Sequence, residues 1–254
     1  MQRSNPNPKV KIAVFGNTGT GKTSLINRYC KKRFNQHQRQ SDTTQSDYET
    51  CSLVQDGYTF PLEIWGVPGT SQALASFSRE NIRNAQCCII VVDLTNSHSF
   101  ETVSFWVQKA KNLTYANQDS FLIVGSRSDM AKSRVVTPED MQALATKFNC
   151  KVIETSAKDD VNVKDAFLML TDPLIKPLVT KFQEQDRRES QATLIVSNIK
   201  NYISNPGTKF PSTWFSGSKI ILDNGEKKQY QMLSPCNGKK LKRLKVKSNH
   251  FVPL

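Results

Sequence analysis

The sequence predicts an α/β protein in which helices cover both faces of a mostly parallel sheet. From Lys9 to about residue 183, short β-branched runs alternate with longer amphipathic stretches, a pattern typical of strands joined by crossover helices. Right-handed crossovers place successive strands parallel to one another. One short link, Asp56-Gly57, joins two runs directly and is typical of a tight hairpin turn. We therefore expect a three-layer sandwich with a six-stranded sheet and one antiparallel edge strand.

The elements follow in order along the chain. The six expected strands are the β-branched runs, at residues 10–15, 51–55, 60–65, 87–93, 120–125 and 151–154. The four expected helices are the amphipathic stretches, at residues 22–33, 100–112, 138–148 and 163–182. The third helix has a clear start, because Thr137 can cap it and Pro138 fits its first turn. After residue 183 the pattern changes, and we expect a short helix at 192–203 and a hairpin of 219–222 with 227–233.

Three regions differ in composition. Residues 1–8 are polar and contain prolines, and we expect them to be disordered. Residues 9–183 form the body described above. Residues 184–254 are a basic extension, with 13 Lys and Arg against 5 Asp and Glu, and they contribute most of the net charge of +13.

Within this extension, residues 239–247 carry six cations and no acid. Such a run can bind an acidic membrane surface or remain a solvated tail. It lacks the interleaved aromatic residues of a platform for single-stranded nucleic acid. Nucleic acid is therefore not an expected partner.

Several classes of protein are excluded by the sequence. The longest apolar run, residues 87–92, is too short to span a bilayer. The first eight residues lack the apolar segment of a secretory signal. The six cysteines show no C-x-x-C spacing and the three histidines are scattered, so we expect free thiols and no zinc site. These observations predict a cytoplasmic protein.

A glycine-rich segment, residues 16–23, fits the phosphate-loop pattern G-x-x-x-x-G-K-[ST]. It follows an expected strand and opens an expected helix, which is the context that this motif requires. Backbone N–H groups of such a loop surround phosphate oxygens, and the helix N-terminus adds the positive end of its dipole. Lys22 would reach the β- and γ-phosphates, and the Thr23 hydroxyl would bind Mg²⁺. The expected phosphate-binding residues here are Gly16, Thr18, Gly19, Thr20, Gly21, Lys22 and Thr23.

Residues 9–183 resemble the Ras-like small GTPases, and within them the Rab branch. The motifs that carry the resemblance occur in family order: the phosphate loop, then residues 43–48, 56–65, 83–93, 124–129 and 154–158. The resemblance implies GTP and GDP as ligands, Mg²⁺ bound by Thr23 and Thr43, and Gly69 donating its N–H to the γ-phosphate. It also implies effector and regulator proteins, for which Tyr48 and Trp65 match two positions of an exposed aromatic triad. The third position, near residues 81–82, carries no aromatic residue.

The resemblance further implies a guanine pocket. Asp129 would accept hydrogen bonds from the N1–H and 2-amino groups of guanine, which adenine cannot offer. A site built on such bonds rejects the wrong base, because its own polar groups would be left unpaired. The implied guanine-binding residues are Phe34, Ser126, Arg127, Asp129, Ser156, Ala157 and Lys158.

Three departures from the family pattern bear on activity. The family's D-x-x-G becomes G-V-P-G at residues 66–69, and loss of the acid that holds Mg²⁺ through water weakens metal binding by about 10- to 100-fold. Thr70 replaces the Gln that orients the attacking water, and threonine is shorter than that residue. Ser126 and Arg127 replace Asn and Lys, which we expect to weaken contacts with guanine and with the phosphate loop.

The sequence thus predicts a Rab-like guanine-nucleotide switch with slow or absent GTP hydrolysis, acting in intracellular membrane traffic. The alternative is a pseudo-GTPase, a fixed protein-interaction module that keeps the fold without switching. A kinase or other phosphoryl transferase is a third class, against which the base-loop motifs argue. The last cysteine is Cys236, so we expect no C-terminal prenyl anchor and, at most, peripheral membrane binding through residues 239–247.

Overall fold

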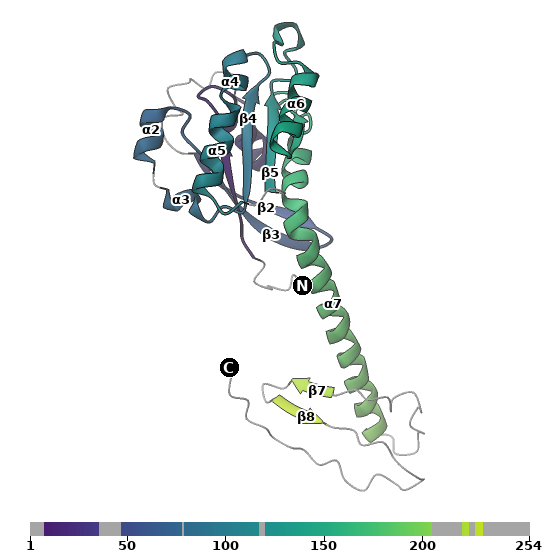
Figure 1. Cartoon of the computed structure of the whole chain (residues 1–254). Coiled ribbons are helices and arrows are strands. Elements are labelled where there is room, and N and C mark those ends of the chain that lie inside the picture. The colour runs from purple at the N-terminus through teal and green to yellow at the C-terminus, as the bar shows by residue number, and fades with distance from the viewer. Residues whose placement is uncertain are drawn as a thin grey trace. The chain divides into compact units, whose positions relative to one another are not determined.

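The computed structural model describes residues 8–35, 47–77, 79–116, 120–204, 220–223 and 227–230 (Figure 1). The first of two compact units, which ends at Val179, contains a six-stranded sheet in the order β2-β3-β1-β4-β5-β6. Its strands are β1 (Val10–Phe15), β2 (Asp47–Gln55), β3 (Tyr58–Gly66), β4 (Cys87–Asp93), β5 (Phe121–Ser126) and β6 (Lys151–Glu154). The predictions for residues 1–7, Thr43, Cys236 and 239–247 concern residues outside the described ranges.

The sheet confirms the predicted topology. β2 is an edge strand and pairs antiparallel with β3, while the other four neighbouring pairs are parallel. The link between β2 and β3 has positive φ at both Asp56 (50°) and Gly57 (83°), as a tight two-residue hairpin turn requires. Both strands are longer than the predicted strands at 51–55 and 60–65. As a result, Asp47 at the start of β2 pairs with Gly66 at the end of β3.

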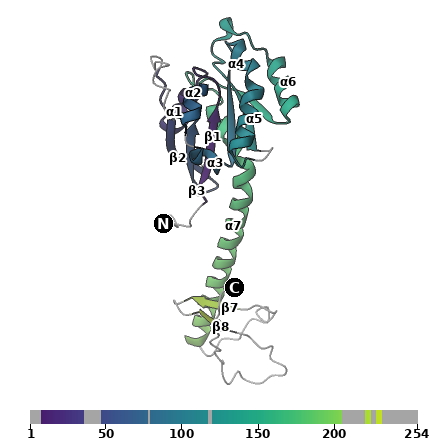
Figure 2. The same ribbon diagram turned by 60° about the vertical axis from the view of Figure 1, so that its left-hand side comes forward.

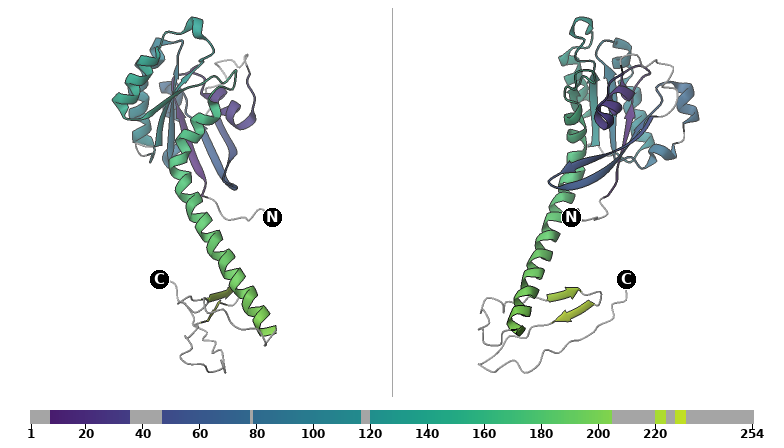
Figure 3. Two further views of the ribbon diagram at one scale, coloured as in Figure 1. Left: turned by 90° about the vertical axis from the view of Figure 1, so that its right-hand side faces the viewer. Right: turned by 180° about the vertical axis from the view of Figure 1, so that it is seen from behind.

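Helices cover both faces of the sheet (Figures 1, 2 and 3). They are α1 (Lys22–Lys31), α2 (Ser71–Ser76), α3 (Glu80–Arg83), α4 (Ser97–Glu101), α5 (Val103–Leu113), α6 (Pro138–Phe148) and α7 (Val163–Ser204), with a 3₁₀ turn at Ala131–Ser133. On one face α1 meets the first part of α7, where the rings of Tyr29 and Phe167 stack 3.9 Å apart. On the other face, Phe15, Trp106 and Leu144 belong to one buried cluster that includes side chains of α3, α5 and α6.

The central strands explain why the sequence shows continuous apolar runs. All seven residues of β4 and all six of β5 are buried, because helices pack against both of their faces. The helix at Pro138–Phe148 has the predicted bounds, and Thr137 forms a capping box with Asp140. The predicted helix at 100–112 is divided at Thr102 into α4 and α5. α2 and α3 were not predicted, because segments of four to six residues are too short to show a helical period.

The last helix is longer than predicted. α7 continues unbroken from Val163 to Ser204, so the expected break between 182 and 192 is not present. The intervening residues, EQDRRESQ, contain no Gly or Pro and are mostly good helix formers even without an apolar stripe. In the second unit, β7 (Ile220–Asp223) and β8 (Lys227–Tyr230) pair antiparallel at the position of the expected hairpin. None of the helices in the described residues is long and apolar enough to cross a membrane.

Candidate functional site

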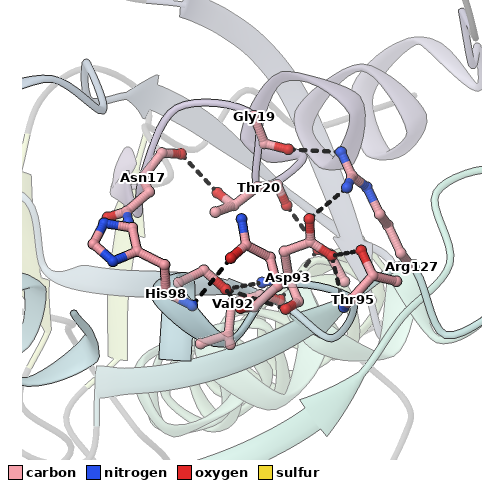
Figure 4. A network of polar contacts seen from close by, with 11 residues as sticks. Asn17, Gly19, Thr20, Val92, Asp93, Thr95, His98 and Arg127 are labelled. Atoms are coloured by element: carbon pink, nitrogen blue, oxygen red, sulfur yellow. Dashed lines mark hydrogen bonds and ion pairs between the residues drawn. The ribbon is translucent and has the colours of Figure 1, made fainter. Parts of the chain in front are cut away.

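The phosphate loop and the base loops meet at the carboxyl ends of the parallel strands. The phosphate loop joins β1 to α1, residues 67–70 follow β3, and residues 127–129 and 155–158 follow β5 and β6. Carboxyl ends of neighbouring parallel strands open at the same edge of a sheet, where α/β folds bind their ligands. Hydrogen bonds join the phosphate loop directly to the segment after β5 (Figure 4).

The phosphate loop adopts a conformation that requires glycine at position 16. Gly16 has φ of 142°, and a Cβ there would lie 2.5 Å from the carbonyl oxygen of Val91 on β4. Further along, the Thr20 hydroxyl donates to the carbonyl oxygen of Asn17 at 2.9 Å. Gly19 and Gly21 also have positive φ. The loop therefore turns tightly beside β4, as a backbone that surrounds phosphate oxygens must.

Lys22 is buried at the base of this loop. Its Nζ donates to the carbonyl oxygens of Gly16 (2.9 Å) and Asn17 (2.8 Å), and only 7% of the residue is exposed. Burial disfavours the charged ammonium and lowers the pKa of Lys22 to about 8, while the nearby Asp47 acts in the opposite direction. A bound phosphate group would add the negative charge that this ammonium needs.

Thr23, the predicted Mg²⁺ ligand, donates its hydroxyl to Oδ2 of Asp47 on β2. Burial raises the pKa of Asp47, and the Thr23 hydrogen bond and the charge of Lys22 oppose that rise. No three His, Cys, Asp or Glu side chains cluster as a metal site within the described ranges. Mg²⁺ does not require such a cluster when it is bound by one or two protein oxygens, nucleotide phosphates and water. Thr23 and Asp47 thus fit an Mg²⁺–nucleotide complex, and the role of Thr43 stays a prediction.

The segment after β3 contacts the phosphate loop at Gly69. A Cβ at Gly69 would lie 2.2 Å from the backbone nitrogen of Thr18, so no larger residue fits there without movement. The next residue, Thr70, caps α2: its Oγ1 accepts a hydrogen bond from the N–H of Ala73 at 3.2 Å. The side chain of Thr70, at the position expected to orient the attacking water, is therefore hydrogen-bonded to α2.

Ser126 connects the base loop to the phosphate loop. Its Oγ lies 2.7 Å from the carbonyl oxygen of Thr20 and 3.1 Å from that of Val92, and the single hydroxyl proton is shared between these two acceptors. The short hydroxyl therefore reaches the phosphate loop, and the expected weakening of this connection stays a prediction. The contact of Ser126 with guanine stays a prediction.

Replacing Ser126 by alanine is expected to lower the free energy of unfolding of the nucleotide-free chain by about 1–2 kcal/mol. The cause is the loss of a buried donor to the carbonyl oxygens of Thr20 and Val92. Urea unfolding followed by tryptophan fluorescence measures the change. Ser133→Ala, which removes an exposed hydroxyl, is the control, and an equal loss in both variants would contradict the prediction.

Arg127 makes a second connection to the phosphate loop. Its Nη2 donates to the carbonyl oxygen of Gly19 at 2.7 Å, and its Nη1 forms an ion pair with Asp93 at the end of β4 (Figure 4). Asp93 is 3% exposed and also accepts hydrogen bonds from the backbone N–H and the hydroxyl of Thr95. The guanidinium is thus held between the phosphate loop and the end of β4, which leaves the aliphatic stem of Arg127 as the part predicted to pack along the base.

Asp129 lies beside the segment after β6. The hydroxyl of Ser156 donates to Oδ1 of Asp129 at 2.7 Å. From α1, Arg28 donates through Nε to the carbonyl oxygen of Ala157 (2.5 Å) and through Nη2 to that of Lys158 (2.8 Å). These bonds fix the backbone whose Ala157 N–H is predicted to meet the guanine oxygen.

Several residues that shape this site were not predicted from the sequence. Arg28 lies in none of the motifs, and Asp47 lies in the motif at residues 43–48 but was given no role at the site. Asp93 could have been found, since it is an acid that ends a buried apolar run. Asn17 lies inside the phosphate loop and accepts hydrogen bonds from Thr102 (3.0 Å) and from the Trp106 indole. Phe34, by contrast, was predicted; it is half-buried just after α1, and its contact with the base stays a prediction.

Comparison with known proteins agrees with this geometry. Residues 11–176 match the model of the Ras family. The Ras-related protein Rab-39A of Mus musculus is 35% identical over 164 residues, which cover 63% of this chain and 75% of the relative. The Ras-related protein Rab7 of Vigna aconitifolia is 33% identical over 183 residues, 70% of this chain and 85% of the relative. The chain is a Rab-like member of the Ras family.

This Rab-like protein has an aromatic pair on its edge hairpin, formed by an exposed tyrosine and a half-buried tryptophan. Tyr48 on β2 is 44% exposed, and its ring centroid lies 4.3 Å from that of Trp65 on β3. Ile82, near the third position of the aromatic triad that the resemblance implied, is fully buried. The third aromatic residue of the implied triad is therefore not found at this position.

Proposed function

We propose that this Rab-like protein is a guanine-nucleotide switch in intracellular membrane traffic that binds GTP and GDP with Mg²⁺ and hydrolyses GTP very slowly or not at all. Two features carry the proposal: Lys22 is bonded at the base of the phosphate loop, and the Thr70 hydroxyl caps α2. The first feature supports nucleotide binding, and the second supports slow hydrolysis.

Nucleotide binding is supported by the way the loops are connected. Lys22 lies under the phosphate loop, where it can meet the β- and γ-phosphates. Ser126 and Arg127 connect that loop to the base loop, and Ser156 orients Asp129. The residues proposed to bind the phosphates and those proposed to bind the base lie on separate loops. These hydrogen bonds therefore set the distance between the phosphate-binding and base-binding parts of the site. When bound, Mg²⁺ would supply charge neutralisation of the phosphates, with Thr23 and Asp47 on its protein side.

Slow hydrolysis is supported by the environment of Thr70. Its hydroxyl accepts the N–H of Ala73 and so completes the first turn of α2. A threonine side chain offers no amide that could contact both a water and the γ-phosphate at once. The attacking water would therefore have no side chain at position 70 to orient it.

Single-turnover release of γ-phosphate tests the hydrolysis proposal. The wild-type chain is expected to fall well below the intrinsic rate of an ordinary small GTPase, which is on the order of 10⁻⁴ s⁻¹. Thr70→Gln is expected to raise the rate at least about tenfold, because it restores an amide beside the γ-phosphate. Thr70→Ser keeps the capping hydroxyl without an amide and serves as the control. A wild-type rate in the ordinary range, or no difference between the two variants, would contradict the proposal.

A fixed interaction module is the second candidate, and the glycine at position 66 together with Thr70 favours it. The nucleotide content of the purified protein separates the two candidates. Bound GTP or GDP supports the switch, whereas an empty chain without measurable guanine affinity supports the module.

In either case we propose residues 9–183 as the Rab-like domain and residues 184–254 as a basic extension, whose run 239–247 meets acidic membrane. Tyr48 and Trp65 are the proposed contact for effector proteins.

A further inference from the structure

We propose that Asp47 supplies from β2 the carboxylate that the family pattern places at position 66 on β3, and that it orients Thr23 and a water of the Mg²⁺–nucleotide complex. The inference rests on the proposed binding of guanine nucleotide, and it assigns a residue to the metal side of that site. It removes the expectation that the glycine at position 66 leaves the site without its acid.

The positions of Asp47 and Gly66 provide the first argument. The two residues lie directly opposite each other in the antiparallel pair, so their side chains project from the same face. A Cβ built on Gly66 would lie 3.0 Å from Cβ of Asp47 and 3.3 Å from its Oδ2. The carboxylate of Asp47 therefore lies within the space that a side chain at position 66 would enter.

The hydrogen bond of Thr23 provides the second argument. Its hydroxyl donates to Oδ2 of Asp47, so the hydroxyl proton points toward the carboxylate. The lone pairs of the Thr23 oxygen then remain for a cation. A carboxylate that accepts from a metal ligand and from metal-bound water is a partner that commonly tunes metal affinity.

The same geometry gives a reason for glycine at position 66. The nearest atoms to a Cβ there are Cβ of Asp47 (3.0 Å), the Cδ1 of Ile26 (3.2 Å) and Oδ2 of Asp47 (3.3 Å). An acid at position 66 would therefore be crowded and would place two like charges side by side, which disfavours the ionised form of both. In this chain the carboxylate that lies in this space comes from β2.

The effect of Mg²⁺ on GDP release tests the inference in the full-length chain. The measured quantity is the ratio of the GDP dissociation rate in EDTA to that in millimolar Mg²⁺. Asp47→Asn is expected to lower this ratio by about 10- to 100-fold, as for other lost partners of a metal ligand. Mn²⁺ titration of the GDP complex, followed by electron paramagnetic resonance, is expected to show an equal loss of metal affinity. This second readout does not depend on catalysis.

Two further variants provide the controls. Glu49→Gln removes the same charge from the same face of β2, two residues away, where Glu49 pairs with Lys31; its ratio is expected to equal that of the wild type. The swap Asp47→Ser with Gly66→Asp returns the acid to β3 and is expected to restore the ratio to within about threefold. Thermal melting shows which variants fold. If Asp47→Asn does not fold, the swap variant tests the role of the carboxylate.

The outcomes separate this inference from the proposed function. A ratio in folded Asp47→Asn equal to that of the wild type, or a folded swap that restores nothing, overturns the role of Asp47. A wild-type chain that binds GDP without any effect of Mg²⁺ overturns the role of Asp47 and leaves nucleotide binding intact. A wild-type chain that binds no guanine nucleotide in either buffer overturns the proposed function, and the role of Asp47 with it.

Discussion

The Lys22→Met variant is expected to lose nucleotide binding while its nucleotide-free form becomes slightly more stable. The loss arises because Lys22 is the cation placed under the phosphate loop, and charge-assisted bonds to two phosphates contribute about 4 kcal/mol. GTP and GDP affinity should therefore fall by about 10³-fold or more. Fluorescence titration with a labelled GDP analogue measures this fall.

The stability gain follows from the cost of burying an ammonium group. Burial lowers the pKa of Lys22 from 10.5 to about 8, which corresponds to about 3 kcal/mol of destabilisation. Methionine removes that cost but leaves the Gly16 carbonyl without its donor, a loss of about 1–2 kcal/mol. In the variant, the Asn17 carbonyl oxygen still accepts a hydrogen bond from the Thr20 hydroxyl. The net gain of about 1 kcal/mol should raise the melting temperature by about 2–4 °C.

The gain depends on pH in a direction that can be checked. Because the folded pKa of Lys22 is lowered, the cost of burial is complete below pH 8 and disappears above the ordinary pKa near 10.5. The difference in unfolding free energy between variant and wild type should therefore shrink as pH rises through this window. Lys31→Met, which removes a half-exposed lysine from the same helix, is the control. A variant with wild-type GDP affinity, or one destabilised by several kcal/mol, would contradict the prediction.

The predictable part of the fold lies where sequence spacing alone determines structure. The strands at Val10–Phe15, Cys87–Asp93 and Lys151–Glu154 have their predicted bounds, since buried β-branched runs have few alternatives. The phosphate loop was predictable because its glycines must take backbone angles that other residues avoid. The unbroken α7 was not, because a solvent-exposed helix needs no apolar period and its middle part shows none.

The candidate site was predictable in its motif residues and not in their neighbours. Asp47 and Arg28 act through a strand pairing and a helix-to-loop contact between residues far apart in sequence. Their partners become visible only when the sheet register and the packing of α1 are known. Ser126 is a different case: its substitution suggested a weaker contact with the phosphate loop, and the structure shows its hydroxyl bonded to that loop.

The Asp129→Ala variant is expected to lose the preference for guanine over adenine. Asp129 is a carboxylate with about four acceptor positions, of which Ser156 occupies one. The others are the proposed acceptors for the N1–H and 2-amino groups of guanine. Sites that hydrogen-bond a ligand group in this way discriminate by about 10⁴- to 10⁵-fold. Without the carboxylate, GDP affinity should fall by about 10³-fold, and the ratio of GDP to ADP affinity should approach about ten.

Competition of GDP and ADP against a labelled nucleotide measures both quantities in one experiment. Asp159→Ala removes an equal charge from an exposed position of the neighbouring loop, so it controls for general electrostatics. Ser156→Ala should give an intermediate loss of about tenfold, because Asp129 remains but one of its oxygens is no longer oriented. A graded series in the order Asp159, Ser156, Asp129 is the signature of a carboxylate that reads the base. If Asp129→Ala kept its preference for GDP over ADP, base recognition would have to come from the backbone of residues 156–158, and the Rab-like protein would bind guanine without its acidic partner.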